Sequence, residues 1–81
     1  MKENLFQTSE YYLAVTLLTL GEELMNVEKN TSPRAIFIFK KSPTINKNIE
    51  EYRKGRILVE PQKLFMNHKL IKSRLYNNFG E

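Results

Sequence analysis

Cysteine and tryptophan are absent from this 81-residue chain, and histidine occurs once, at position 68. No disulfide can therefore form, and a structural zinc site is not expected, because such sites combine several cysteine and histidine ligands. Glycine and proline number three each, so the chain has few points at which a helix or strand must break. The sequence thus predicts a domain that folds without a metal or a cofactor.

Long hydrophobic runs are also absent. The longest apolar stretch, Tyr11–Leu20, is interrupted by Thr16 and Thr19 and is too short to cross a bilayer. The N-terminus carries no basic segment followed by an apolar one, so no signal peptide is expected and we predict a cytoplasmic protein. The composition, 41% hydrophobic and 27% charged, is that of a folded globular domain. A chain of this length has room for one core, which predicts a single domain over residues 1–81.

Groups that could carry catalysis are scarce. There is no cysteine nucleophile, and the three isolated glycines form no phosphate-binding loop. The single histidine falls on the apolar side of a predicted helix, where we expect a partly buried, hydrogen-bonded side chain rather than a general base. Glu22-Glu23 and Glu50-Glu51 are adjacent pairs whose side chains diverge, so we expect solvated surface. No catalytic residue, metal ligand or cofactor is predicted, and the chain is not expected to be an enzyme.

The first third of the chain reads as a strand followed by a helix. Residues 4–8 are short and extended in character. Leucines then recur at helical spacing and predict a helix over residues 10–20. Thr8 or Ser9 offers an N-cap oxygen, and Gly21 is placed to end the helix in the left-handed conformation.

A hairpin is predicted next. Residues 25–28 alternate between apolar and polar, residues 30–33 have turn chemistry, and residues 35–39 are apolar without a break. An unbroken apolar run is typical of a strand covered on both faces, so we expect this strand to be central in its sheet.

The second half of the chain predicts two more helices. One starts at Ser42-Pro43 and is closed by Gly55, and a short apolar run at 57–59 follows as a bridge or brief edge strand. The last helix spans residues 61–78, and its apolar stripe comprises Leu64, His68, Ile71, Leu75 and Phe79. The predicted fold is α+β: an antiparallel sheet of about three strands with three helices, in the order strand, helix, strand, strand, helix, short strand, helix.

Several segments together resemble a family of short uncharacterised domains from bacteria, archaea and their phages and mobile elements. The resemblance is carried by residues 6–14 with Leu20-Gly21, by 27–29 and 36–39, by 52–55, and by 70–76. It covers nearly the whole chain and implies one domain and a phage or mobile-element context. It implies no activity and no active-site residues.

Charge is divided unevenly along the chain. Residues 1–39 contain three basic and five acidic residues, a net of −2, whereas residues 40–76 contain ten basic and three acidic residues, a net of +7. A basic half is the usual footprint of a polyanionic partner. Part of it also has a simpler explanation, because cations are favoured at helix C-termini.

We therefore hypothesise a nucleic-acid-binding accessory protein that contacts the phosphate backbone with little sequence specificity. Tyr52 and Tyr76 are candidate stacking groups. The candidate phosphate contacts are Lys40, Lys41, Arg53, Lys54, Arg56, Lys69, Lys72 and Arg74.

A second function remains open. On the last helix, Met66 and Leu70 lie one turn apart and off the apolar stripe, beside Lys63 and Arg74. Apolar side chains with basic neighbours suit a contact surface, either for a larger protein or complex or for a second copy of the chain in a homodimer. The sequence does not choose between this protein-interaction module and the nucleic-acid-binding protein.

Overall fold

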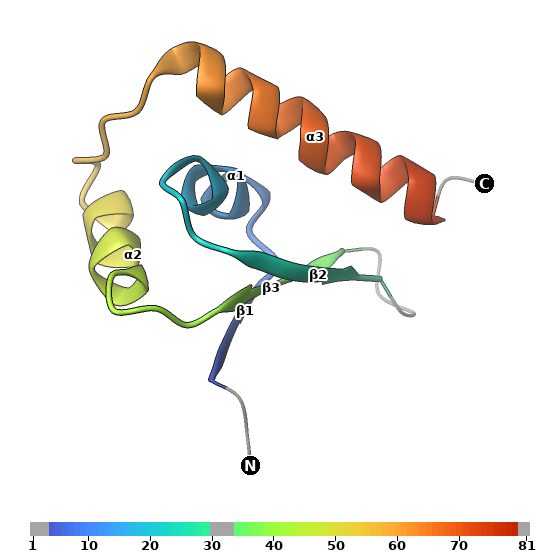
Figure 1. The fold of residues 1–81 in the computed structure, drawn as a ribbon, viewed down its shortest axis with the longest axis horizontal. Helices are drawn as coiled ribbons and strands as arrows, with labels where there is room; N and C mark the ends of the chain where they lie inside the picture. Colours follow the sequence, from blue (N-terminus) through green and yellow to red (C-terminus); the bar gives the residue numbers. More distant parts are fainter. Residues whose placement is uncertain (1–3, 30–33, 80–81) are drawn as a thin grey trace.

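The computed structural model describes residues 4–29 and 34–79. It places six elements in the order β1 (Leu5–Thr8), α1 (Tyr11–Thr19), β2 (Leu24–Glu28), β3 (Ile36–Lys40), α2 (Ile45–Arg53) and α3 (Pro61–Phe79) (Figure 1). The strands form one antiparallel sheet in the order β1-β3-β2. This confirms the predicted α+β class and the central position of the apolar strand. The predicted turn at 30–33 lies outside the described residues.

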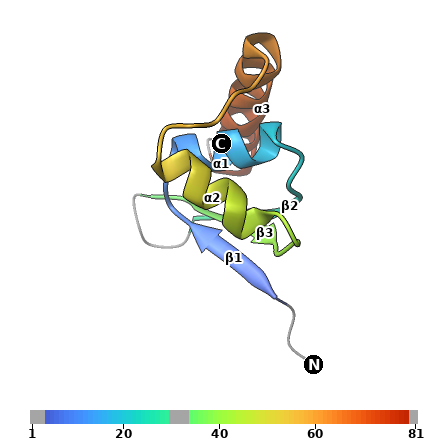
Figure 2. The ribbon, with the colours of Figure 1, turned by 90° about the vertical axis from the view of Figure 1, so that its left-hand side faces the viewer.

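Helix α1 occupies the centre of the domain. It lies between the sheet and α3, and α2 packs beside it (Figures 1 and 2). Residues 13–17 are buried without interruption, because neighbouring elements cover the helix on several sides. The position of α3 is therefore set by its packing on α1, on the side away from the sheet.

The two faces of the sheet differ. The strand register places Phe6 opposite Phe39 and Val27 opposite Phe37, so these rings and the valine point to one face and build the core. All three helices lie on this side of the sheet (Figures 1 and 2). The helices therefore cover one face of β3, and no helix of the described residues lies on its second face (Figures 1 and 2). There, Ile38 is nevertheless buried between the two flanking strands.

Both predicted helix-ending glycines are confirmed. Gly21 has φ +98° and Gly55 has φ +71°, in the left-handed region that glycine adopts without steric cost. After α1, the amides of Gly21 and Glu22 donate to the carbonyls of Leu18 and Leu17. The same pair of backbone bonds follows α2, so each helix closes in a Schellman motif.

The helix starts differ in detail from the predictions. Helix α1 begins at Tyr11, and the Thr8 hydroxyl accepts a hydrogen bond from the Glu10 amide (3.1 Å), just ahead of the helix. Helix α2 begins at Ile45 instead of at Ser42-Pro43, because residues 43 and 44 form a turn before it. Helix α3 begins at Pro61 as predicted, and Glu60 accepts a hydrogen bond from the Lys63 amide (2.9 Å).

The predicted short strand at 57–59 does not form. Ile57 and Val59 are half-buried, but Leu58 is 93% exposed, and the segment has no strand partner in the described part of the chain. It connects α2 to α3 on the helical side of the domain, away from the sheet (Figure 1). The half-burial of Ile57 and Val59 thus arises without strand pairing.

Candidate binding face on the last helix

Helix α3 is fixed to the domain by its predicted apolar stripe. Ile71 is fully buried, and Leu64 and Leu75 are half-buried against the core. The Asn67 amide also donates to the Thr19 hydroxyl of α1 (3.0 Å). The side chain of Phe79, the last residue of the predicted stripe, lies outside the described part. These contacts determine which residues of α3 face the solvent.

Four exposed side chains lie in a line along α3: Phe65, Lys69, Lys72 and Tyr76. Their spacing of four, three and four residues keeps them on one side of a helix, over a length of about 16 Å at 1.5 Å per residue. The two rings at the ends are 62% (Phe65) and 63% (Tyr76) exposed. A shallow hollow lies within this line and is lined by Phe65, His68, Lys69 and Lys72.

Helix α1 adds aromatic rings beside this line. Tyr12 is exposed, and its ring centroid lies 6.3 Å from that of His68. Tyr11 is half-buried, with its ring centroid 5.1 Å from that of His68. We refer to Tyr12, Phe65, His68, Lys69, Lys72 and Tyr76 as the aromatic–lysine surface. The two helices that carry this surface, α1 and α3, are held together by the apolar stripe of α3.

The histidine has the structural role that was predicted for it. His68 is half-buried, its ring nitrogen Nδ1 lies 3.2 Å from the Tyr11 hydroxyl, and its carbonyl oxygen accepts from that hydroxyl at 3.1 Å. Burial raises the pKa of Tyr11, and the nearby Tyr12 and Tyr76 raise it further. The Tyr11 hydroxyl therefore remains a protonated donor, and it holds the His68 ring at the edge of the hollow.

A second group of residues occupies the other flank of the exposed side of α3. This apolar flank consists of the residues predicted for protein contact: Lys63, Met66, Leu70 and Arg74. Met66 is 68% exposed and Leu70 is 51% exposed, which confirms that both lie off the stripe. Lys63 is exposed and Arg74 is half-buried.

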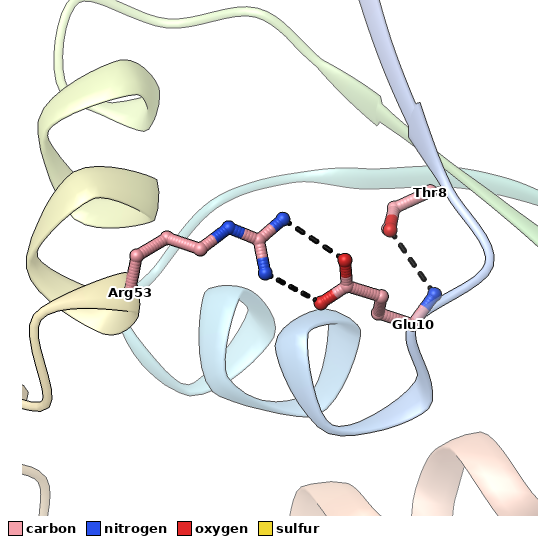
Figure 3. A network of polar contacts seen from close by, with 3 residues as sticks. All are labelled: Thr8, Glu10 and Arg53. Atoms are coloured by element: carbon pink, nitrogen blue, oxygen red, sulfur yellow. Dashed lines mark hydrogen bonds and ion pairs between the residues drawn. The ribbon is translucent and has the colours of Figure 1, made fainter.

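The basic cluster at the end of α2 is paired with carboxylates. Arg53 donates two hydrogen bonds to the carboxylate of Glu10, at 2.7 and 2.9 Å, which joins the end of α2 to the start of α1 (Figure 3). These bonds lower the pKa of Glu10. Tyr52, one of the two candidate stacking groups, is half-buried against the core, with the Arg53 guanidinium 6.0 Å from its ring centroid.

The other two cations of this cluster are paired as well. The ammonium of Lys54 lies 3.1 Å from the carboxylate of Glu50, and Arg56 lies 3.2 Å from that of Glu51. All of these groups are at least partly exposed, so each pair adds little to stability. Each carboxylate nevertheless offsets one positive charge, and the cluster as a whole presents little net charge.

Helix α3 carries the net charge of the whole chain. It contains four basic residues and no acidic residue, and the chain has a net charge of +4. The remaining nine basic residues are balanced by nine acidic ones. Four of the ten basic residues of the basic half thus lie on α3, where no acidic residue of the same helix offsets them.

The eight predicted phosphate contacts do not form one surface. Lys40 and Lys41 lie at the end of β3, where they line a hollow with Asn4 and Glu23. The cluster of Arg53, Lys54 and Arg56 ends α2, and the other three residues lie on α3, across the domain from the end of β3 (Figure 1). Of the eight, the structure brings Lys69 and Lys72 together one turn apart on the same side of a helix.

Comparison with known families assigns the chain. A family model described as "Domain of unknown function (DUF5659)" matches residues 3–77. The chain belongs to this family. No curated protein and no solved structure matches it. The matched range of this DUF5659 domain includes every residue of the aromatic–lysine surface. Within residues 4–29 and 34–79, no helix is long and apolar enough to cross a membrane, and no group of three acidic or histidine side chains could hold a metal ion.

One acidic residue of the DUF5659 domain corrects the sequence analysis. Glu22 is not solvated surface but 5% exposed, whereas Glu23 is exposed as predicted. The Oε1 of Glu22 accepts from the Ser42 hydroxyl (2.5 Å), and its Oε2 accepts from the Thr44 hydroxyl (2.7 Å) and the Asn48 side-chain amide (2.8 Å). The carboxylate thus lies at the start of α2, where the helix dipole favours a negative charge. Three polar donors at a helix start were the sequence signal for such an anion site.

The exposure of Phe65 was also missed. The sequence predicted no role for this residue, and the structure places it beside the stripe, on the exposed side of the helix. The spacing of Phe65 from Lys69, at four residues, was a signal available in the sequence, because it aligns the ring with the two lysines.

Proposed function

We propose that this DUF5659 domain is a non-enzymatic nucleic-acid-binding accessory protein that contacts phosphates mainly through α3. The observation that carries this proposal is the concentration of the net charge of +4 on one exposed helix without an acidic residue. Lysines that neutralise phosphates release condensed counterions, which supplies most of the affinity of non-specific binding. The partner recognised by this chemistry is the phosphate backbone of a nucleic acid.

The lysines of the aromatic–lysine surface are the principal contacts in this proposal. Neither Lys69 nor Lys72 lies within ion-pair distance of a carboxylate of the described residues. Arg53, by contrast, already donates to Glu10 and would have to exchange one anion for another. Lys40 and Lys41 are exposed at the end of β3 and serve as a secondary contact for a longer strand.

The non-enzymatic part of the proposal is supported by the structural roles of His68 and Glu22. His68 has its Nδ1 beside the Tyr11 hydroxyl, at 3.2 Å. The Glu22 carboxylate is buried and accepts from three neutral donors. Both groups make contacts that join different elements of the domain.

The cellular setting belongs to the same proposal. A nucleic-acid partner agrees with a cytoplasmic protein, as the sequence predicts. A phage or mobile-element origin, implied by the resemblance to short uncharacterised domains, agrees with a small accessory factor that acts on nucleic acid.

Fluorescence anisotropy with labelled oligonucleotides, measured over a series of salt concentrations, tests the proposal. We expect the affinity of the wild type to fall steeply with salt, with a log–log slope of about −0.7 to −0.9 per phosphate neutralised. The Lys69→Gln/Lys72→Gln variant should lose affinity and flatten this slope by about 1.4 to 1.8, which is about 0.7 to 0.9 per lysine.

The matched control is Lys54→Gln/Arg56→Gln, which changes the net charge by the same amount at ion-paired positions. We expect it to retain most of the wild-type affinity. Absence of binding to any nucleic acid at low salt would contradict the proposal, and an equal loss in both variants would contradict the assignment to α3.

A specific observation favours a second candidate function, docking on a larger protein through the apolar flank. Met66 and Leu70 are both more than half exposed on this flank, and aliphatic side chains contribute little to phosphate binding. The variant Met66→Gln/Leu70→Gln separates the two functions. A protein partner that is retained at high salt after nuclease treatment, released by this variant and kept by Lys69→Gln/Lys72→Gln, would favour docking.

A further inference from the structure

We infer that the nucleic acid bound by the aromatic–lysine surface is single-stranded, with unpaired bases stacked on its exposed rings and phosphates against its lysines. This inference rests on the proposed function and specifies its substrate class. The rings that carry it are Tyr12, Phe65 and Tyr76, each more than half exposed. Large aromatic side chains are seldom left in water without a binding role when several share one surface.

The exposed rings discriminate between single strands and duplexes. In a duplex, the bases are already stacked on each other and present only their edges in the grooves. A single strand presents the faces of its bases, and proteins that bind single strands combine a positive surface with aromatic side chains on which these faces stack. The rings at both ends of the line on α3 can therefore stack on the bases of a single strand, whereas a duplex presents no base faces to them.

The order of side chains along α3 fits this arrangement. The line runs ring, lysine, lysine, ring, from Phe65 to Tyr76, with Lys69 about 6 Å along the axis from Phe65. A strand lying along the helix would place phosphates at Lys69 and Lys72 and bases on the rings at either end. The hollow lined by Phe65, His68 and the two lysines lies between them and is open to a flat apolar group.

The surface is also organised before binding. The hydroxyl of Tyr11 holds His68 by its ring and its backbone, and the Tyr11 ring packs edge-on to the His68 ring at 5.1 Å. Side chains held in place by the domain lose less conformational entropy on binding than mobile ones. The floor of the hollow is thus preformed by the packing of α1 against α3.

Charge complementarity selects a polyanion over a second copy of the chain at this position. Lys69 and Lys72 lie in the centre of the surface, and α3 has no acidic residue to meet them from another molecule. Two such surfaces placed face to face would oppose like charges.

The experiment compares single-stranded and duplex probes of equal length. Labelled oligothymidine and oligouridine provide the DNA and RNA arms, and a mixed-sequence duplex provides the third. We expect the wild type to bind at least one single strand more tightly than the duplex. The variant Phe65→Ala/Tyr76→Ala should weaken single-strand binding by at least about fivefold per ring, and leave the salt slope unchanged because both lysines remain.

The matched control is Met66→Ala/Leu70→Ala, which removes two exposed apolar side chains from the other flank of α3. It should bind the single strands like the wild type, and thermal melts verify that both variants are folded. Tyr12→Ala, on a different helix, provides a second aromatic variant with the same expected direction.

The outcomes separate this inference from the proposed function. The inference is overturned if the wild type binds the duplex as tightly as the single strands or more tightly, or if Phe65→Ala/Tyr76→Ala binds single strands like the wild type. In either case, a loss of affinity in Lys69→Gln/Lys72→Gln would still support the proposed function. Absence of binding to all three probes at low salt overturns both.

Discussion

The hydroxyl of Tyr11 contacts His68 twice, donating to its carbonyl oxygen at 3.1 Å and lying 3.2 Å from its Nδ1. A tyrosine hydroxyl has one proton, so both contacts are satisfied together when Nδ1 carries a proton and donates to the tyrosine oxygen. The residues are 57 positions apart, and the contact joins α1 to α3. The same pair therefore holds the candidate binding face in position on the core.

Replacing Tyr11 by phenylalanine should weaken this connection. Tyr11→Phe removes the hydroxyl, and with it the second donor to the His68 carbonyl and the partner of its Nδ1, which costs about 1 kcal/mol of unfolding free energy. Tyr12→Phe is the matched control, because Tyr12 is exposed and its hydroxyl forms no hydrogen bond within the described residues. Urea denaturation compares the two. Equal midpoints for Tyr11→Phe and the wild type would show that the contact does not stabilise the domain.

Phe37 lies in the central strand β3, on the face that packs against the helices, and it is fully buried. Phe37→Ala should cost about 3–5 kcal/mol, a large share of the roughly 5–15 kcal/mol that stabilises a small domain. Leu58→Ala, at an exposed position between α2 and α3, should have no measurable effect. A thermal melt distinguishes them, and a Phe37→Ala melt that coincides with the wild type would contradict the assigned core.

Glu22 joins the loop after α1 to the start of α2. Glu22→Leu keeps a similar volume but removes the acceptor for three donors, of which each unsatisfied one costs about 1–3 kcal/mol. We therefore expect a loss of at least about 2 kcal/mol. Glu23→Leu changes the adjacent, exposed residue and should be close to neutral. If calorimetry gave the same melting temperature for both variants, the buried carboxylate would have no stabilising role.

The Glu10–Arg53 pair predicts a dependence of stability on pH. Arg53 lowers the pKa of Glu10 below its ordinary value of 4.5, so the folded state holds the carboxylate more strongly in its charged form than the unfolded state does. The stabilisation is complete above pH 4.5 and is lost as the pH falls through the lowered pKa.

Arg53→Gln should therefore be less stable than the wild type near neutral pH and equal to it in strong acid. Glu10→Gln, which has no carboxyl to titrate at this position, should behave in the same way. Denaturation midpoints measured across this pH range provide the test, and a difference that persists unchanged into acid would exclude the pair as its cause.

Much of the fold was predictable because its signals are local. The left-handed glycines, the proline at the start of α3 and the unbroken apolar strand each act within a few residues of their own position. The short apolar run at 57–59 is also a local signal, but a strand needs a partner, and this segment has none among the described residues. The apolar run alone therefore predicted a strand that does not form.

The candidate site was less predictable because it depends on contacts between distant residues. In the sequence, Arg53 is a cation at a helix end with no evident partner. In the fold it is paired with Glu10, which is 43 residues away. Glu22 was likewise predicted to lie on the surface, whereas in the fold it accepts a hydrogen bond from Asn48, which is 26 residues away. The alignment of Phe65 with Lys69, by contrast, follows from helical spacing, and its exposure depends on how α1 covers α3.

Self-association through α3 has an electrostatic cost that sets its response to salt. The apolar flank offers Met66 and Leu70 to a second copy, but each α3 brings four cations and no acidic residue to the contact. Salt screens such repulsion beyond about 8 Å at physiological ionic strength. We therefore expect the homodimer population, measured by light scattering at several concentrations, to rise with salt, opposite to nucleic-acid binding.

Met66→Gln/Leu70→Gln should remove this self-association, while Lys69→Gln/Lys72→Gln should strengthen it at low salt by removing like charges. A dimer that weakens with salt would instead indicate a contact between α3 and the acidic residues of the partner copy. A monomer at every concentration and salt would leave the apolar flank to a different protein, whose surface would have to supply the negative charge that this helix lacks.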